Sequence, residues 1–250
     1  MLQKSKKIII ITGSSKGIGM EIAKKFLDNK YFFLILNSRK KNRFINQTSK
    51  KYSNIKFIKG DISTILTQKK IIKFLKQKKF SIDSLICNAG GGKNPKNGEE
   101  KITNYKDSFN INFYSTINII YTLKKYFKKH AKVVCISSIA SKSIVNTPIA
   151  YSVAKSALNS FIVNFAKNYK KNKICITGIL PGHVMHDNSI WSKKKISNPN
   201  LIKDMLKNHM PTSTWIKSTD IADLAYFLIN HSTSSFNGSL IETDGGITTK

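Results

Sequence analysis

Three polar residues in the second half of the chain have the types and spacing of a proton-transfer site. Ser138 follows an apolar run, Tyr151 comes further downstream, and Lys155 lies four residues beyond Tyr151. Residues four apart share one face of a helix, so a helix here would place the ammonium beside the phenol. A neighbouring positive charge favours the phenolate and lowers the pKa of the phenol. We therefore expect Tyr151 to exchange protons near neutral pH, with the Ser138 hydroxyl close by.

A glycine-rich turn near the start of the chain is typical of nucleotide binding. The run TGSSKGIG at 12–19 directly follows an apolar run and precedes an amphipathic segment. Glycines permit a sharp turn, and the N–H groups that open a helix can bind a pyrophosphate. The spacing is not GxGxxG, so an ordinary strand-to-helix turn is the alternative. We expect cofactor contacts from Gly13, Ser15, Lys16, Gly17, Ile18 and Gly19.

The residues after the second apolar run discriminate between the two nicotinamide cofactors. An acidic residue there would accept hydrogen bonds from a ribose 2′-hydroxyl. The chain instead has Ser38, Arg39 and Lys40, and Lys16 in the glycine-rich turn adds another positive charge. These cations favour a 2′-phosphate, so we predict NADP(H). The alternative is that Arg39 and Lys40 are solvated residues of a lysine-rich chain.

Short β-branched or aromatic runs alternate with amphipathic segments along the whole chain. Strands are expected at 7–12, 31–37, 55–59, 84–87, 132–137, 174–179 and 239–242. Helices are expected at 18–29, 41–52, 64–78, 105–129, 151–170 and 219–230. This alternation predicts an α/β fold, a Rossmann-type doubly wound parallel sheet of seven strands with helices on both faces, in a single domain spanning 1–250. The stretch 181–211 does not fit, and we interpret it as a substrate-lid loop with a short helical pattern near 200–208.

The charge of the chain invites a nucleic-acid interpretation, which its composition weakens. The 250 residues carry a formal net charge of +30, but arginine occurs only at Arg39 and Arg43. Base-edge and bidentate phosphate recognition favour arginine over lysine. We therefore expect no specific nucleic-acid partner, and only salt-sensitive, non-specific association with polyanions.

The cysteines and the apolar runs indicate the compartment. Cys87, Cys135 and Cys175 each lie in an apolar stretch, and no CxxC pair is present. This pattern predicts reduced, buried thiols in a cytoplasmic protein. No apolar run approaches the roughly 20 residues that a membrane-spanning helix requires, so no membrane association is expected.

Together these motifs resemble the compact, single-domain branch of the short-chain dehydrogenase/reductase family from end to end. The matches, in chain order, are 12–19, Asn88-Ala89-Gly90, Asn112, Ser138, 151–155, Pro181-Gly182 and 244–246. The resemblance implies a catalytic tetrad of Asn112, Ser138, Tyr151 and Lys155. It also implies cofactor contacts from Asp61, Ile62, Asn88, Ala89, Gly90, Tyr151, Lys155, Pro181, Gly182 and Val184. A homodimer or homotetramer built on the helices that carry Asn112 and Tyr151 is implied as well.

The activity that the resemblance implies is reversible reduction of a ketone to a secondary alcohol. NADPH would deliver the hydride, Tyr151 would give a proton to the developing alkoxide, and Ser138 would stabilise its charge. Lys155 would bind the nicotinamide ribose and lower the pKa of Tyr151, and Asn112 would hold a water. One departure is His186, where the family often has a threonine that helps to hold the nicotinamide. His183 and His186, next to Asp187, could be metal ligands, but no third or fourth ligand is apparent, so no metal is predicted.

The substrate stays open at this stage. The loop at 90–93 and the tryptophan-bearing segment with Met185 and Trp191 are similar to a subgroup acting on keto-sugars or sugar acids of polysaccharide biosynthesis. The general pattern equally suits 3-ketoacyl thioesters. The lysines at 193–195 either attract an anionic substrate or are solvated surface. Two rivals are a non-catalytic dinucleotide-sensing or polyanion-binding protein on the same fold, and an epimerase or dehydratase, for which the residues after 179 leave little room.

Overall fold

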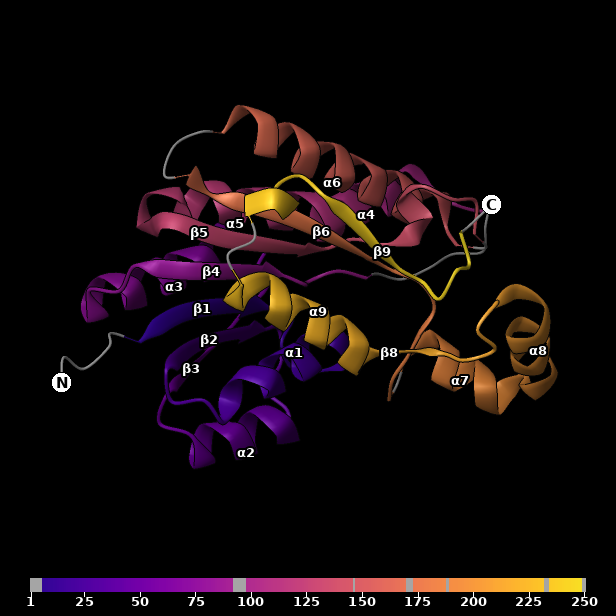
Figure 1. The fold of residues 1–250 in the computed structure, drawn as a ribbon, viewed down its shortest axis with the longest axis horizontal. Helices are drawn as coiled ribbons and strands as arrows, with labels where there is room; N and C mark the ends of the chain where they lie inside the picture. Colours follow the sequence, from indigo (N-terminus) through magenta and orange to yellow (C-terminus); the bar gives the residue numbers. More distant parts are fainter. Residues whose placement is uncertain are drawn as a thin grey trace.

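The structure is a computed structural model that describes residues 6–91, 98–145, 147–169, 173–187, 189–231 and 234–248, with only the backbone of residue 190. A seven-stranded parallel sheet lies between two layers of helices (Figure 1). The strand order is β3-β2-β1-β4-β5-β6-β9. Since the order reverses between β1 and β4, a crevice at their carboxyl ends is the expected ligand site of such a sheet.

The predicted strands and most predicted helices are confirmed. The strands of the sheet are β1 (Lys7–Thr12), β2 (Phe32–Ser38), β3 (Ile55–Lys59), β4 (Ile82–Cys87), β5 (Phe127–Ile136), β6 (Cys175–Pro181) and β9 (Leu240–Thr243). The helices include α1 (Gly17–Leu27), α2 (Arg43–Lys51), α3 (Ile65–Lys78), α4 (Ile102–Phe109), α5 (Ser115–Leu123), α6 (Ile149–Asn168) and α9 (Ser218–Asn230).

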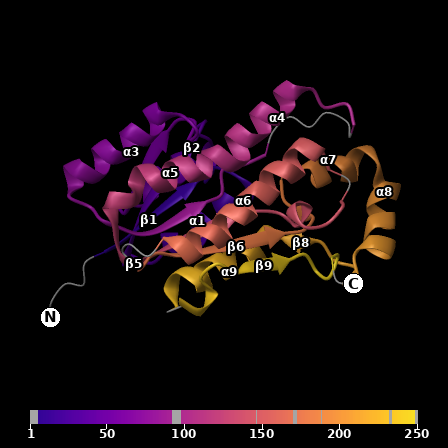
Figure 2. The same ribbon diagram turned by 90° about the horizontal axis from the view of Figure 1, so that it is seen from above.

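Strand β1 shows why consecutive apolar residues form a central strand. Ile8 and Ile10 pack into one core cluster with α3, α5 and α6, whereas Ile9 and Ile11 pack into the other with α1, α2 and α9. Side chains alternate between the faces of a strand, so a strand covered on both sides needs an apolar residue at every position. Figure 2 shows α5 and α6 side by side over one face of the sheet, where Tyr121 and Phe161 bring their ring centroids to 6.3 Å.

The prediction of one long helix at 105–129 is wrong in two respects. A π-helical turn, Asn110–Tyr114, separates α4 from α5, and α5 ends at Leu123. Strand β5 then begins at Phe127, because this buried residue pairs with Ile82 of β4. Tertiary pairing therefore overrides the helical pattern after residue 123. Such π-turns widen a helix locally and often occur at functional sites.

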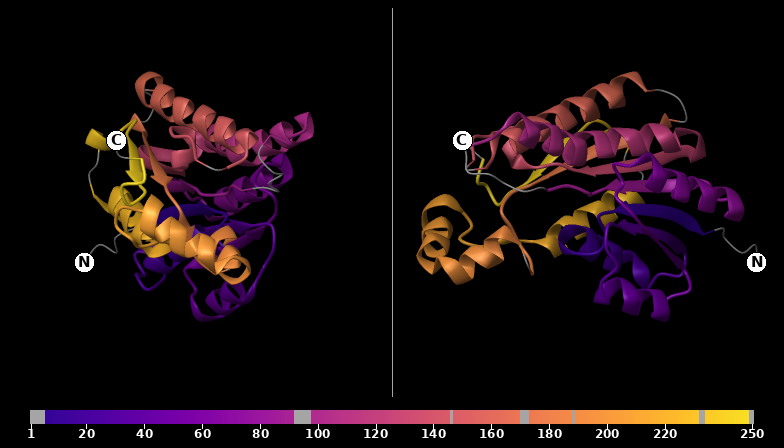
Figure 3. Two further views of the ribbon diagram at one scale, coloured as in Figure 1. Left: turned by 90° about the vertical axis from the view of Figure 1, so that its right-hand side faces the viewer. Right: turned by 180° about the vertical axis from the view of Figure 1, so that it is seen from behind.

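The stretch 181–211 is not a loop. It contains β7 (Val184–Met185), α7 (Ile190–Ser197), α8 (Pro199–Asp204) and a π-helical turn, Met205–His209, and β7 pairs with β8 (Ile216–Lys217). Ser189 and Asn198 cap the two helices through their side chains, a start signal that the composition of the stretch obscured. The helical pattern expected near 200–208 is confirmed. Figure 3 shows α7 and α8 beyond the carboxyl edge of the sheet.

Two of the three thiols are buried as predicted. Cys87 and Cys135 are buried opposite each other on β4 and β5, whereas Cys175, at the start of β6, is only partly covered. In the part of the chain that the structure describes, no helix is long and apolar enough to cross a membrane.

Candidate active site

The sequence motifs converge on the carboxyl edge of the sheet. The glycine-rich turn follows β1, Asn88 follows β4, Ser138 follows β5, and Gly182 follows β6. All these strands are parallel, so their carboxyl ends meet at one edge, which is where open α/β sheets bind ligands.

The glycine-rich turn is held against the end of β4. Thr12 Oγ1 accepts hydrogen bonds from the N–H groups of Asn88 and Ala89, both at 3.0 Å. Asn88 Nδ2 in turn donates to the carbonyl oxygens of Thr12 (3.1 Å) and Gly13 (3.0 Å). Gly13 has a φ of +66°, and an added Cβ would lie 2.8 Å from Asn88 Nδ2. The turn therefore requires glycine for both its conformation and this close approach.

The start of α1 has the donor set of an anion site. Its N-cap residue, Lys16, makes no side-chain capping hydrogen bond, and Gly17, with a φ of +54°, opens the helix. The first N–H groups of a helix have no intrahelical partner and carry the positive end of the helix dipole. Uncapped donors beside a lysine fit the pyrophosphate of a dinucleotide.

The loop after β2 is tied to this turn and presents cations. Asn42 Nδ2 donates to the carbonyl oxygen of Ser15 at 2.6 Å, and Ser38 Oγ donates to that of Lys40 at 2.7 Å. Arg39 and Lys40 are exposed, and neither forms an ion pair with any residue that the structure describes. The loop therefore places unpaired positive charge next to the glycine-rich turn.

Asn112 and Lys155 meet at the segment after β4. A Cβ added at Gly90 would lie 3.0 Å from Asn112 Oδ1 and 3.5 Å from Lys155 Nζ. Asn112, buried in the π-helical turn, accepts from Gly91 N (2.8 Å) and donates to Gly91 O (3.0 Å). The buried Lys155 Nζ donates to Ile136 O at 2.8 Å. Residues that are distant in sequence thus share one small polar site.

Tyr151 and Lys155 lie on the same side of α6, with Nζ 5.9 Å from the phenol ring centroid. Burial raises the pKa of Tyr151, and the hydrogen bond from Ser138 acts in the opposite direction. Burial also lowers the pKa of Lys155 to about 8. The expectation that Lys155 lowers the pKa of the phenol is therefore corrected. Burial is the largest influence on the pKa of Tyr151, because it disfavours the charged phenolate. The Lys155 ammonium donates its hydrogen bond to the backbone of β5.

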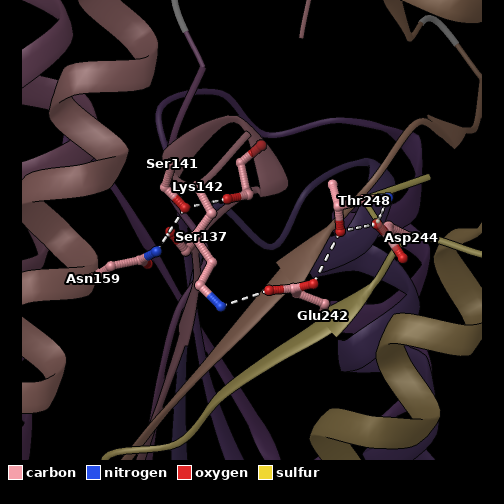
Figure 4. A network of polar contacts seen from close by, with 8 residues as sticks. Ser137, Ser141, Lys142, Asn159, Glu242, Asp244 and Thr248 are labelled. Carbon is pink, nitrogen blue, oxygen red and sulfur yellow. Dashed lines mark hydrogen bonds and ion pairs between the residues drawn. The ribbon is translucent and has the colours of Figure 1, made fainter. Parts of the chain in front are cut away.

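A polar network supports the short turn that carries Ser138 (Figure 4). Ser137 Oγ donates to Asn159 Oδ1 (2.7 Å), and Asn159 Nδ2 donates to Ser141 Oγ (2.6 Å). Ser141 Oγ completes the chain by donating to the backbone carbonyl oxygen of Ser138. Asn159 is a site residue that was not predicted from the sequence. The signal available was an amide four residues after Lys155, on the face of the helix that meets the sheet.

The C-terminal turn is joined to the same region. Lys142 Nζ pairs with Glu242 at 2.6 Å, and the Thr248 hydroxyl lies 2.9 Å from Glu242 and 2.6 Å from Asp244 (Figure 4). Although burial acts to raise it, the hydrogen bonds from Thr248 and Gly246 hold the pKa of Asp244 below its usual value. The aspartate of the motif at 244–246 therefore orders the turn beside β9.

The other predicted cofactor residues occupy different environments. Asp61 follows β3 and accepts hydrogen bonds from the N–H (2.9 Å) and hydroxyl (2.7 Å) of Ser63. Val184 is half-buried in β7. The side chain of Ile62 packs into the hydrophobic core, so only its backbone is available to a ligand. Gly92 and Lys93 of the predicted loop lie outside the described residues.

The doubly wound sheet and the glycine-rich turn at its carboxyl edge define a nucleotide-binding protein of the α/β class. The sequence profile of the short chain dehydrogenases matches residues 7–195, and the chain belongs to this family.

Individual relatives are similar over different lengths. "Dehydrogenase/reductase SDR family protein 7-like" of Dictyostelium discoideum is 32% identical over 197 residues, which cover 73% of this chain and 61% of that protein. The 7alpha-hydroxysteroid dehydrogenase of Escherichia coli (strain K12) is 25% identical over 244 residues, covering 96% and 93%. The solved structure "ElxO with NADP Bound" has 26% identity and a TM-score of 0.87, covering 98% of this chain and 100% of that one.

Proposed function

We propose that the protein is an NADP(H)-dependent reductase that interconverts a ketone and a secondary alcohol. The observation that carries the proposal is the convergence of Asn112, Ser138, Tyr151 and Lys155 at the sheet edge that also holds the glycine-rich turn. These groups supply a proton donor, a hydrogen-bond donor and a buried cation within one site. A protein that only senses a nucleotide needs none of the three.

When bound, the nicotinamide cofactor supplies or accepts the hydride. Tyr151 donates its proton to the carbonyl oxygen as negative charge develops there, and its raised pKa keeps the phenol protonated for this step. Ser138 donates a hydrogen bond to the same oxygen. Lys155, with a pKa of about 8, exchanges its own proton near neutral pH, and Asn112 holds a water that returns protons from solvent.

NADP(H) is the proposed cofactor because of the charge beside the glycine-rich turn. Arg39 and Lys40 follow β2, at the place where an acidic residue would favour NAD(H). Asn42 donates a hydrogen bond to Ser15 and so holds this loop against the glycine-rich turn. A 2′-phosphate carries negative charge that these free cations attract. Solved structures similar to this chain include one with NADP bound and one in complex with NAD, so the proposal rests on the charge beside the turn.

The proposed substrates are a keto-sugar or sugar acid and a 3-ketoacyl thioester. The segment at 181–211, together with Trp215, would cover the substrate with an aromatic cluster. In this cluster the ring centroid of Trp191 lies 4.5 Å from that of His183 and 5.2 Å from that of Trp215, and Lys194 Nζ lies 4.8 Å from the Trp191 centroid. The Lys194 ammonium beside these rings would attract the carboxylate of a sugar acid.

The experiment is a panel of keto-sugar acids, 3-ketoacyl thioesters and steroid ketones, followed by loss of NADPH absorbance. Turnover of one class with a clear preference for NADPH supports the proposal. NADPH binding without turnover of any carbonyl, together with salt-dependent nucleic-acid binding, supports the non-catalytic rival instead.

We propose a homodimer or homotetramer formed through α4, α5 and α6. These elements, with the π-turn between α4 and α5, expose large apolar side chains, namely Tyr114, Tyr121, Ile149, Val153 and Val163. Apolar surface of this kind is typical of protein interfaces. Light scattering after size exclusion tests the assembly.

A cytoplasmic location remains a prediction from the pattern of cysteines, which indicates reduced thiols.

A further inference from the structure

Asn37 is a buried polar residue near the carboxyl end of an apolar strand. It follows the apolar residues 32–36 of β2, and only 1% of it is exposed. A buried amide costs free energy unless its hydrogen-bonding groups find partners inside the protein. The contacts of Asn37 with the neighbouring strands therefore determine what this residue does.

The side chain of Asn37 holds the end of β3. Its Nδ2 donates to the carbonyl oxygens of Ile58 (2.9 Å) and Gly60 (3.1 Å). The N–H of Gly60 in turn donates to the carbonyl oxygen of Ser38 at 3.0 Å. Asp61, a predicted cofactor residue, directly follows Gly60. The start of the segment that carries Asp61 is therefore fixed to the end of β2.

The backbone of the same residue holds the glycine-rich turn. The carbonyl oxygen of Asn37 accepts hydrogen bonds from the N–H (3.0 Å) and the hydroxyl (3.2 Å) of Ser14, which is fully buried. Strands β1, β2 and β3 are neighbours on one side of the sheet (Figure 1). Asn37 thus joins the segments that follow all three strands at the carboxyl edge.

We propose that Asn37 is a positioning residue that holds together the part of the site that binds the adenosine 2′-phosphate half of the cofactor. The inference rests on the proposed function, in which the glycine-rich turn, Arg39, Lys40 and Asp61 contact NADP(H). Asn37 acts on the cofactor through these segments, because its own polar groups are occupied by the bonds described above. Tyr151 lies on α6, which takes no part in these bonds, so the chemical step should not depend on Asn37.

Asn54 is a matched control at the opposite edge of the sheet. It directly precedes β3 and is 4% exposed. Its Nδ2 donates to the carbonyl oxygen of Phe32 (3.0 Å), and its carbonyl oxygen accepts from the N–H of Leu34 (2.9 Å). Both asparagines therefore join β2 to β3 through a buried amide. Loss of a buried amide affects stability at both positions, whereas an effect on cofactor binding is expected at Asn37 alone.

The test is calorimetric titration of wild type, N37A, N37T and N54A with NADPH and with adenosine 2′,5′-bisphosphate, together with urea unfolding and steady-state kinetics. N37T keeps a residue that favours strands and serves as the second variant if N37A does not fold. Leaving buried backbone groups unpaired at a site costs about tenfold in affinity. We expect both Asn37 variants to raise the Kd of both ligands about tenfold, and to raise the KM for NADPH in parallel while kcat at saturating NADPH stays near that of wild type.

N54A should lower the urea concentration at the midpoint of unfolding about as much as N37A does, and should keep the wild-type Kd for both ligands. Equal weakening of cofactor binding by N54A, an unchanged Kd in both Asn37 variants, or a loss of kcat at unchanged Kd overturns the inference. Wild type that binds neither NADPH nor NADH overturns the proposed function and the inference with it. Wild type that binds NADPH no better than the Asn37 variants do overturns the inference alone.

Discussion

Lys155 Nζ donates a 2.8 Å hydrogen bond to the carbonyl oxygen of Ile136, the last residue of β5. This bond fixes the buried ammonium at the end of the strand that leads to Ser138, and it leaves Nζ beside Gly90 and Asn112. The same burial lowers the pKa of Lys155 from 10.5 to about 8. A cation that is costly to bury is therefore kept at the centre of the proposed site.

Lys155→Met should change how the stability of the protein depends on pH. The pKa of Lys155 is lower in the folded protein, about 8, than in the unfolded chain, so the unfolded state binds more protons between these values. The free energy of unfolding of wild type should rise as the pH increases from about 8 toward the usual lysine range, by roughly 2–3 kcal/mol. Urea unfolding across this range checks the prediction. K155M should lack the rise, and a rise of equal size in K155M would contradict it.

Ser138→Ala should slow turnover and move the pH profile of alcohol oxidation to higher pH. Oxidation needs the Tyr151 phenolate, and the hydrogen bond from Ser138 lowers a phenol pKa that burial has raised. Removing the hydroxyl therefore raises the pKa of Tyr151 further, and loss of one such donor costs about 100-fold in kcat. The measurement is kcat against pH in both directions. An oxidation profile that does not shift would contradict the claim that Ser138 lowers the pKa of Tyr151.

Asn159→Ala should impair catalysis without contact to any reacting atom, because Asn159 is a positioning residue. Its amide links Ser137 to Ser141, which holds the backbone of Ser138. Loss of these buried bonds should lower the free energy of unfolding by about 1–3 kcal/mol.

The readouts for this variant are kcat, KM and chemical unfolding. We expect kcat to fall more than KM changes, because the hydroxyl of the turn loses its orientation. Asn164→Ala is the control on the same helix, since Asn164 is exposed and its side chain donates to Ser160 one turn earlier. Equal effects of the two substitutions would refute a specific role for Asn159.

Arg39→Glu should weaken the preference for NADPH over NADH. The substitution replaces an unpaired cation after β2 with the acidic residue that favours a ribose 2′-hydroxyl. We expect the kcat/KM ratio of NADPH to NADH to fall by about tenfold or more. Lys50→Glu makes the same change of charge at an exposed position near the end of α2, and should leave the ratio unchanged. If K50E lowers the ratio as strongly as R39E, general electrostatics is responsible.

The fold could be predicted from the sequence because its strands are covered on both faces. Runs such as 8–11 are apolar at every position, and in a chain of alternating segments a run of this kind is typical of a central parallel strand. The site could be located for the same reason, since parallel strands deliver all their following residues to one edge. Strand order alone therefore predicts one shared site for the motif at 12–19, Asn112, Tyr151 and Lys155. In the structure, Asn112 and Lys155 lie beside Gly90, and Tyr151 lies beside Lys155.

The predictions that the structure corrects depended on tertiary contacts. The helix at 105–129 ends early because Phe127 finds a partner in Ile82 across the sheet. The pKa of Tyr151 rises because burial, which spacing does not report, outweighs the hydrogen bond from Ser138. Asn159 was missed because its partners, Ser137 and Ser141, lie on a different element.

The most direct test of the account is Tyr151→Phe, which removes only the phenol oxygen. We expect turnover of the preferred carbonyl substrate to fall by about 10²–10⁴-fold, the usual contribution of a general acid, while the Kd for NADPH stays near that of wild type. Tyr31→Phe, at the opposite end of the sheet, should retain both properties. Normal turnover by Y151F would contradict the proposed mechanism.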